Sequence, residues 1–320
     1  MACLLFPVSL LFRALVALRR KLYRAGVLPS VALPVPVIVV GNLGVGGTGK
    51  TPLTIHLAQA LRARGRRPGI VSRGYRGRAD GPLAVDSRSD PAQTGDEPVV
   101  LARRAGCPVV VGRDRAAAAA FLLASHPECD VILCDDGLQH YRLRRDVEVA
   151  VFDRRGTMNG WCLPAGPLRE PVERLREVDA VVFNGTPSPP PSTFGRPVFA
   201  LRLLANAFAR PEAPDVPRTA AEFSGLRLHA VAGIGAPERF FAQLEGMGLD
   251  FEPHPFPDHH EYRAADLAFV GDAILTTEKD AVKLARLSLP LPLWVLPVTA
   301  EASPDLATFV LEKLDGRPPA

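Results

Sequence analysis

Residues 35–51 read VPVIVVGNLGVGGTGKT and decide the fold. The apolar run from Val35 to Val40 is typical of a buried strand, and a helical pattern from Leu53 to Leu61 follows the glycine-rich turn. Residues 44–51 fit the pattern G-x-x-x-x-G-K-[ST], which indicates a phosphate-binding loop when it lies between such a strand and such a helix. A chance G-K-T in an ordinary glycine-rich turn is the alternative, which the matching strand and helix disfavour.

Each residue type in this loop suits the phosphates of a nucleotide. The glycines allow consecutive backbone N–H groups to turn toward the phosphates, and the N-terminus of the following helix adds partial positive charge. We expect Lys50 to reach the β- and γ-phosphates of ATP and the Thr51 hydroxyl to ligate Mg²⁺. The predicted nucleotide-binding residues are Gly44, Val45, Gly46, Gly47, Thr48, Gly49, Lys50 and Thr51.

Strands alternate with helices on the C-terminal side of this loop. Apolar runs predict strands over 69–72, 109–111, 131–134, 147–152, 180–183 and 198–203, with helices over 97–104 and 114–124 between them. This alternation predicts an α/β fold, in which a P-loop NTPase-like and mostly parallel sheet carries helices on both faces. We assign this kinase-type P-loop domain to residues 1–207.

A second, smaller α/β domain is predicted over residues 208–320. Its predicted strands cover 228–232, 273–275 and 293–295, and its predicted helices cover 237–247, 262–269 and 279–286. A proline-rich stretch over 211–217 lies next to the proposed boundary, where a break between domains is expected.

Residues 1–25 are predicted to form an amphipathic helix. Leu11, Leu15, Leu18 and Leu22 recur at helical spacing, while Arg13 falls on the other face. The uncharged run is shorter than the roughly 20 apolar residues that a bilayer crossing needs, and its basic cluster follows the apolar stretch, unlike a secretory signal. Two interpretations stay open: the helix lies in a membrane interface, or it docks on the protein's own core.

Composition and charge limit the kinds of protein that this sequence can encode. The 320 residues are 47% hydrophobic and 22% charged, which is typical of one large or two medium globular domains. The five cysteines include no C-x-x-C pair, so they predict neither a disulfide framework nor a cysteine zinc site, and a reducing cytosol fits them. The first 79 residues carry a charge of +13 and the remainder carries −9. We therefore expect an anionic partner at the N-terminal side.

Several acidic residues of the sequence are suited to binding Mg²⁺ or to transferring a proton. Asp135 and Asp136 come directly after four apolar strand residues, the arrangement in which a carboxylate holds Mg²⁺ beside a phosphate-binding loop. One of the two could instead cap a helix. Asp96 is a candidate to orient or deprotonate a nucleophile, although alone it is equally typical of a first helical turn. Asp258-His259-His260 could tune such a base, with a solvated loop as the default interpretation.

Polar side chains at the carboxyl ends of the predicted strands are candidates for substrate binding. Arg73 and Arg113 lie at this edge, where open α/β sheets bind ligands, and they could clamp a phosphate. Simple surface solvation explains each arginine equally well. Gln139 and His140 extend the aspartate pair with hydrogen-bonding groups, and Tyr75 follows Arg73 closely.

Taken together, these segments resemble the tetraacyldisaccharide 4′-kinase family, the P-loop kinases of lipid A biosynthesis. The resemblance rests on residues 37–42, 72–75, 95–98, 112–115, 135–140, 163–171, 258–259 and 276–280, besides the loop. It implies ATP-dependent phosphorylation of the 4′-hydroxyl of tetraacyldisaccharide 1-phosphate by a peripheral protein at the cytoplasmic face of the bacterial inner membrane.

The resemblance also implies roles for single residues. Asp96 would be the catalytic base, assisted by His259, with Lys50 as the third catalytic residue. Glu170 would join Thr51, Asp135 and Asp136 in the metal and phosphate region. The choice of His259 over His260 rests on the Asp-His match alone. The implied partners are the lipid A disaccharide precursor and an anionic inner-membrane surface, with a monomer expected.

Two other classes of function compete. A membrane-recruited P-loop ATPase acting as a switch would carry an extra lysine early in the loop, where this chain has Val45. A nucleic-acid-binding protein would need aromatic residues interleaved with the basic ones, and the basic N-terminal stretch lacks them. Both alternatives are therefore disfavoured, and we expect no nucleic-acid partner.

Overall fold

The phosphate-binding loop lies at the centre of a nine-stranded sheet, in a computed structural model that describes residues 2–188 and 190–316. β1 (Val37–Gly41) is buried along its whole length and pairs in parallel with β5 (Val131–Asp135) and β6 (Val147–Asp153). The strand order is β15-β8-β7-β6-β1-β5-β2-β4-β3. The central strands are covered on both faces, which is why they occur in the sequence as apolar runs without alternation.

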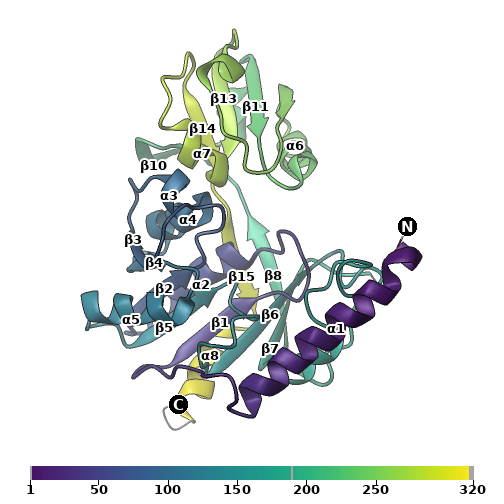
Figure 1. Cartoon of the computed structure of the whole chain (residues 1–320). Helices are drawn as coiled ribbons and strands as arrows, with labels where there is room; N and C mark the ends of the chain where they lie inside the picture. The colour runs from purple at the N-terminus through teal and green to yellow at the C-terminus, as the bar shows by residue number, and fades with distance from the viewer. Residues whose placement is uncertain (1, 189, 317–320) are drawn as a thin grey trace.

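The flanking strands complete this sheet (Figure 1). They are β2 (Pro68–Ser72), β3 (Leu83–Val85), β4 (Val109–Val111), β7 (Ala180–Asn184), β8 (Val198–Leu204) and β15 (Thr299–Ser303). The edge strands β3 and β15 are antiparallel to their neighbours, and the other pairs are parallel. The prediction of a mostly parallel P-loop sheet is confirmed.

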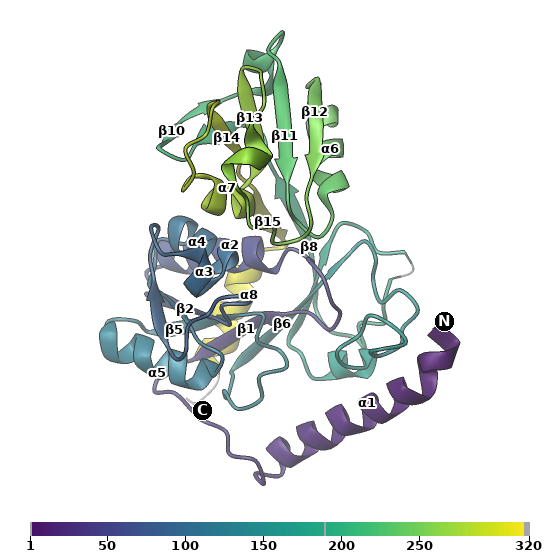
Figure 2. The same ribbon diagram turned by 45° about the horizontal axis from the view of Figure 1, so that its top comes forward.

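Helices cover both faces of the sheet, as the alternation predicts (Figure 2). The elements on one face are α2 (Lys50–Ala63), α4 (Asp96–Arg104), which follows the short α3 (Pro91–Thr94), and α8 (Leu306–Asp315). The elements on the other face are α5 (Arg115–Ser125) and the 3₁₀ turn η1 (Val172–Arg176). Each face has its own buried apolar cluster, so the strand ends that carry polar residues are held in fixed positions.

A second unit is built on a six-stranded sheet with the order β10-β9-β14-β13-β11-β12. Its strands are β9 (Phe208–Arg210), β10 (Ala213–Arg218), β11 (Leu228–Ala232), β12 (Phe251–Pro255), β13 (Ala273–Thr277) and β14 (Leu293–Leu296). Its helices are α6 (Pro237–Gly246) and α7 (Glu278–Leu284), with 3₁₀ turns η2 (Ala220–Phe223) and η3 (Ala264–Leu267).

The chain returns to the first sheet after the second unit. β15 pairs with β8, and the α8 residues Leu306 and Val310 are completely buried in the first unit's core. The second unit is thus inserted between β8 and β15, and the expectation that residues 208–320 form one domain is wrong for residues 299–315. The reason is that β15 is a polar edge strand, and the apolar face of α8 does not reveal which sheet it covers.

Two further segments of the second unit differ from the sequence predictions. The helix predicted over 262–269 is only the turn η3, because the Asp266 carboxylate accepts a hydrogen bond from the Arg263 N–H (2.9 Å) and closes the chain locally. β12 was not predicted because Pro253 and Pro255 lack an N–H donor. It forms nevertheless, since β12 is an edge strand, where proline is tolerated.

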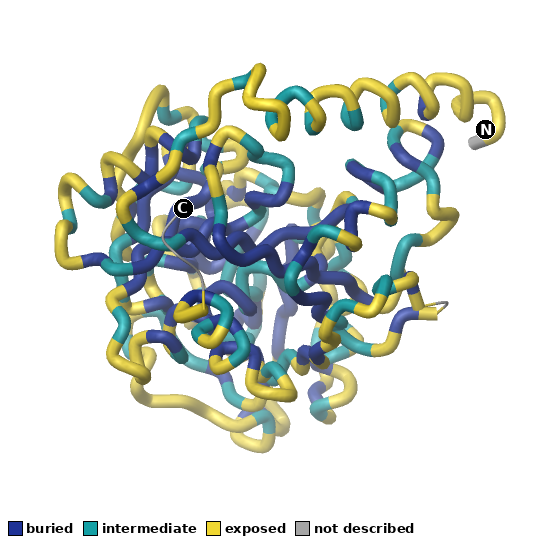
Figure 3. The backbone as a smooth tube through the Cα atoms, turned by 90° about the horizontal axis from the view of Figure 1, so that it is seen from below, coloured by how far each residue is buried: buried dark blue, intermediate teal, exposed yellow. Residues whose placement is uncertain are grey.

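The N-terminal helix α1 (Ala2–Arg24) lies along the outside of the first unit (Figure 3). The Ser9 hydroxyl donates to the Cys162 carbonyl oxygen (2.7 Å). Arg20 and Arg24 form ion pairs with Glu177 at 3.4 and 2.6 Å. These residues lie on the face of α1 that is turned toward the protein.

The leucine stripe of α1 lies on the other face. Leu11, Leu15 and Leu18 are 61%, 57% and 53% exposed. An amphipathic helix is therefore confirmed. It docks on the protein through Phe12, which packs against the first unit's core, and through the half-buried Leu22, while the rest of the leucine stripe stays exposed. None of the helices in the described ranges has the length and apolarity that a membrane crossing requires.

Candidate active site

The phosphate-binding loop connects β1 to α2 in a conformation that depends on glycine. Gly46 and Gly49 have φ angles of +96° and +94°, which favour glycine. The Arg155 guanidinium lies over Gly46. Both of its terminal nitrogens are 3.0 Å from the position that a Cβ atom on residue 46 would occupy. Within the described residues, the buried Thr48 hydroxyl oxygen has no hydrogen-bond partner. A loop that binds phosphate or an ion would supply that partner.

Lys50 and the aspartate pair meet at the edge of the sheet. The Lys50 Nζ lies 3.7 Å from Asp136 Oδ1, and the Arg169 guanidinium lies 3.1 and 3.2 Å from the two Asp136 carboxylate oxygens. Burial would raise the pKa of Asp136, but the charges of Lys50 and Arg169 outweigh burial and hold this pKa below its usual value. Asp136 is therefore a carboxylate that already has two cationic neighbours.

Asp135 has a different environment. Its side chain is almost completely buried at the end of β5 and accepts a hydrogen bond from the Thr54 hydroxyl (3.1 Å). Burial, together with the charges of Glu97 and Asp136, raises the pKa of Asp135 to about 7. A cation bound at this position would favour the charged form, and carboxylate and hydroxyl oxygens are ligands that Mg²⁺ prefers. Asp135 is thus a buried carboxyl group at the edge of the sheet whose charged form a neighbouring cation would stabilise.

Asp96 meets His259 although 163 residues separate them in the chain. Asp96 lies in the first turn of α4, and His259 lies in the loop after β12. The His259 Nδ1 is 3.0 and 3.1 Å from the two Asp96 carboxylate oxygens, and Lys283 Nζ is 3.7 Å from one of them. Burial would raise the pKa of Asp96, but the hydrogen bond and charge of His259 and the nearby lysines lower it to about 2. Asp96 is therefore ionised at neutral pH.

The structure distinguishes between the two adjacent histidines. His260 stacks on Phe256, with ring centroids 4.7 Å apart, and its Nε2 lies 3.2 Å from Asp266. His259 has a φ of +61°, an uncommon backbone conformation for a non-glycine residue, and this conformation accompanies its contact with Asp96. His259, and not His260, is the histidine beside Asp96.

Ion pairs join the two units around this contact. α4 and α7 are linked by the pairs Lys279–Glu97 and Arg104–Glu278. Arg239 of α6 lies 3.3 Å from Asp153 at the end of β6. Between the units lies a cavity of about 240 Å³, lined by Thr51, Ile55, Glu97, Phe240 and Thr277 among others. A larger inter-unit cavity of about 700 Å³ has none of the predicted site residues in its lining.

The residues predicted to bind substrate divide into two groups. Arg73 and Arg113 are exposed and have no side-chain partner in the described part of the chain, and the ring of Tyr75 lies 5.6 Å from that of His259. These three side chains are available to a ligand. His140 is not, because its Nε2 accepts a hydrogen bond from the Arg115 backbone N–H (3.2 Å) and burial lowers its pKa to about 4.

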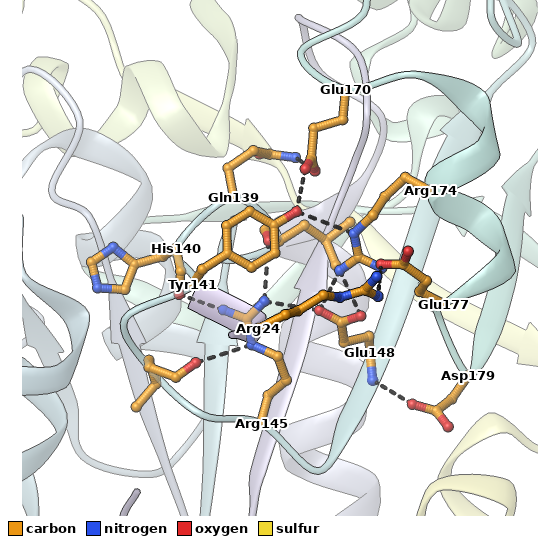
Figure 4. A network of polar contacts seen from close by, with 12 residues as sticks. Arg24, Gln139, His140, Tyr141, Arg145, Glu148, Glu170, Arg174, Glu177 and Asp179 are labelled. Carbon is orange, nitrogen blue, oxygen red and sulfur yellow. Dashed lines mark hydrogen bonds and ion pairs between the residues drawn. The ribbon is translucent and has the colours of Figure 1, made fainter. Parts of the chain in front are cut away.

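Glu170 belongs to a buried network of polar side chains (Figure 4). Its carboxylate accepts hydrogen bonds from the Gln139 amide (2.9 Å) and from the Tyr141 hydroxyl. The structure thus gives Glu170 two hydrogen-bond donors, and its role as a metal ligand stays a prediction. The preceding residue, Arg169, pairs with Asp136, and its guanidinium also lies 3.5 Å from the Gln139 amide oxygen. Gln139 also donates to the Asn42 carbonyl (3.1 Å) and so positions the loop.

The same network contains a buried arginine. Arg174 has a side chain only 2% exposed, and its Nη2 donates to both Glu148 carboxylate oxygens at 2.6 Å. Its Nε also donates to the Tyr141 hydroxyl (3.2 Å), and Arg145 contributes a second cation to Glu148 (2.8 Å). Burial would raise the pKa of Glu148, but the two arginines hold it below its usual value. The network anchors the segment that carries Gln139 and Glu170.

Several residues of the site were missed by sequence reasoning. Arg169, Arg155 and Lys283 are single cations whose positions depend on contacts between distant segments. Asp153 had a usable signal, because it ends an apolar strand in the same way as Asp135 does.

Comparison with known proteins gives consistent matches. A family model described as "Tetraacyldisaccharide-1-P 4'-kinase" matches residues 1–315. The tetraacyldisaccharide 4′-kinase of Azoarcus sp. (strain BH72) is 56% identical over 321 residues, covering 100% of this chain and 94% of the relative. That of Aromatoleum aromaticum is 54% identical, covering 100% and 96%. A crystal structure of the "apo" form of LpxK from Aquifex aeolicus in complex with ATP matches with a TM-score of 0.83 at 29% identity, covering 98% of this chain and 99% of that one.

The buried arginine leads to a prediction about stability. Replacing Arg174 with alanine leaves a buried carboxylate short of its main partner, and we expect the free energy of unfolding to fall by about 3–5 kcal/mol. The measurement is urea denaturation. Arg13→Ala is the matched control, since Arg13 forms an exposed pair with Glu173 at 3.6 Å, and it should change the free energy of unfolding by no more than about 1 kcal/mol. Equal losses for both variants would contradict the role given to burial.

Proposed function

This chain belongs to the tetraacyldisaccharide 4′-kinase family, and on that premise we propose how its site performs the reaction. It is an ATP-dependent kinase of lipid A biosynthesis, which phosphorylates the 4′-hydroxyl of tetraacyldisaccharide 1-phosphate. The observation that carries the assignment of residues is the 3.0 Å contact between Asp96 and His259. Asp96 is an ionised carboxylate in the first turn of α4. The next residue, Glu97, is close enough to Asp135 to raise the pKa of Asp135.

Residues 44–51 hold the phosphates of ATP. The loop amides and the N-terminus of α2 provide hydrogen-bond donors and partial positive charge. Lys50 neutralises charge on the β- and γ-phosphates, and Asp136 holds its ammonium group 3.7 Å away, in position for this role. Arg155, which lies over Gly46, adds a second cation on the exposed side of the loop.

Asp135, Asp136 and Thr51 are the residues that would hold Mg²⁺. When bound, the ion supplies positive charge that stabilises the transferring phosphoryl group. The raised pKa of Asp135 supports this assignment. Burial disfavours the charged form of this carboxyl, and a neighbouring cation would stabilise that charged form. Glu170 is left out, since hydrogen bonds from Gln139 and Tyr141 occupy its carboxylate.

Asp96 accepts the proton of the attacking hydroxyl. With a pKa of about 2 it is a weak base, so it takes the proton only late, as the bond to phosphorus forms. A loose phosphoryl-transfer transition state needs no more activation of the nucleophile than this. His259 and Lys283 hold the carboxylate in one orientation, and orientation is the larger part of the effect.

Arg73, Tyr75 and Arg113 bind the phosphorylated disaccharide. The exposed guanidinium groups of Arg73 and Arg113 lie at the carboxyl edge of the sheet and can pair with the 1-phosphate of the substrate. Tyr75, next to His259, offers a surface for a sugar ring near the base. Gln139 and His140 have a different role, because their hydrogen bonds go to backbone groups of the loop and of α5.

The helix α1 holds the enzyme at the cytoplasmic face of the inner membrane. Its exposed leucines enter the interface, and the exposed Lys21 lies at headgroup level, whereas Arg20 and Arg24 pair with Glu177. A lipid substrate is confined to that surface, so a peripheral enzyme gains access to it by binding there. Basic residues near an anionic surface contribute roughly 1 kcal/mol each.

Transfer of label tests the function of the site. Purified protein is incubated with γ-labelled ATP, Mg²⁺ and tetraacyldisaccharide 1-phosphate, and label should appear on the lipid. Lys50→Ala should lower this turnover by roughly 10²- to 10³-fold, while Lys313→Ala, a lysine of α8, should leave it unchanged. Release of free phosphate without labelled lipid would favour the ATPase switch instead.

The base assignment predicts a loss that does not vary with pH. Because the pKa of Asp96 is about 2, this carboxylate is ionised between about pH 5 and 9. Asp96→Asn should therefore lower kcat by roughly 10²-fold or more at each pH in that range. Asp90→Asn, a conservative change at the N-cap of α3, is the control. Wild-type turnover of Asp96→Asn at saturating substrate would rule out this role.

The membrane assignment predicts a loss of binding to vesicles. Replacing both Leu11 and Leu15 with aspartate should weaken sedimentation with vesicles of anionic phospholipid by roughly tenfold or more. The pair Val216→Asp and Val270→Asp makes the same change at exposed apolar residues of the second unit and should have little effect. If both pairs weaken binding equally, net charge and not the α1 face explains the result.

A further inference from the structure

We propose that His229, Glu252 and His254 form a zinc-binding site at the edge of the second sheet. One ligand atom from each of the three residues lies within 4.8 Å of the other two. The site is separate from the kinase site, because none of the three contacts Asp96, His259 or the phosphate-binding loop among the described residues. The inference therefore does not depend on the proposed function.

The strand register explains why these side chains meet. β11 and β12 are parallel neighbours, with His229 opposite Glu252 and Val231 opposite His254. Residues 252 and 254 are two apart, so they share one face of β12, and His229 lies on the same face of β11. Three metal-binding side chains are thus held on one surface by backbone hydrogen bonds.

The distances suit a tetrahedral ion. His229 Nδ1 lies 3.0 Å from His254 Nε2 and 3.6 Å from a Glu252 oxygen, and His254 Nε2 lies 3.9 Å from the other Glu252 oxygen. Ligand atoms around tetrahedral zinc are about 3.3 Å apart, given zinc–nitrogen bonds of about 2.0 Å. The observed separations are shorter than that value for one pair and longer for the other two, so small side-chain rotations would bring the three ligand atoms to the separations of a zinc site. Glu252 is 60% exposed, which leaves the fourth position open to water.

The imidazoles are already oriented for binding. The Nε2 of His229, which is 2% exposed, donates to the Val270 carbonyl oxygen at 3.2 Å. This hydrogen bond directs the lone pair of Nδ1 toward the cluster, as in most metal-ligating histidines. Both rings also stack on Phe269, with centroid distances of 4.6 Å for His229 and 4.0 Å for His254. Little side-chain freedom is lost when an ion binds.

The chemistry of the donors selects the ion. Two neutral imidazoles and one carboxylate suit Zn²⁺, whereas Mg²⁺ and Ca²⁺ prefer oxygen ligands throughout. In the metal-free pair, His254 Nε2 donates its proton to His229 Nδ1. Zinc takes the place of that proton on Nε2, and the proton moves to Nδ1 of the same ring, so His254 binds the ion as a neutral imidazole. The ion would also tie β12, an edge strand with two prolines, to β11.

Direct titration with Zn²⁺ tests the site. The full-length protein is titrated calorimetrically in excess Mg²⁺, so that the kinase site does not take up zinc, and one equivalent should bind. Co²⁺ in place of Zn²⁺ should give the visible absorption of a tetrahedral complex. His254→Gln and Glu252→Gln should each weaken the affinity by more than roughly tenfold, the lower range for changes around a metal.

The controls separate this site from other histidines and from misfolding. The double variant His126→Gln and Glu128→Gln removes a similar histidine–glutamate pair elsewhere on the surface and should bind zinc like the wild type. Zinc should raise the melting temperature of the wild type but not of Glu252→Gln, whose exposed side chain can change without disturbing the core. Wild-type zinc affinity in both site variants, or binding lost in the surface control, would overturn the proposal.

Discussion

The contact between Asp96 and His259 is the constraint on which the site depends. Asp96 belongs to the first unit and His259 to the second, so the pair exists only while the two units are held together. Ion pairs between α4 and α7, and between Arg239 and Asp153, hold them in this position. Because the second unit is inserted between β8 and β15, both of its connections lead back to the sheet that carries the phosphate-binding loop.

Opposite electrostatic environments give neighbouring carboxyl groups different tasks. Asp96 is buried among His259 and lysines, which outweigh the effect of burial and lower its pKa, whereas Asp135 is buried beside other acids and has a raised pKa. The first group is a permanent anion that can receive a proton late in a reaction. The second has a site for a cation beside it. The same residue type thus has a lowered pKa at one position and a raised pKa at the other because its surroundings differ.

The leucine stripe of α1 and the phosphate-binding loop are different parts of the first unit. The α1 residues that face the protein, such as Ser9 and Arg20, fix the helix in place, and this leaves the leucine stripe exposed. The buried pair of Arg174 and Glu148 lies under the segment that positions Gln139 beside the loop. The first unit therefore carries both an exposed apolar stripe on α1 and the phosphate-binding loop.

The sequence alone determined the central strands, the phosphate-binding loop and the aspartates after β5, because these depend on patterns within about twenty neighbouring residues. It also offered Asp96 and residues 258–260 as candidates, and resemblance to a family then assigned the roles of Asp96 and His259. Tertiary structure decided which histidine faces Asp96, that Arg169 pairs with Asp136 while Glu170 accepts from Tyr141, and that β15 and α8 return to the first sheet. Each of these outcomes depends on packing between distant segments, and local sequence carries no information about which distant surface a side chain will meet.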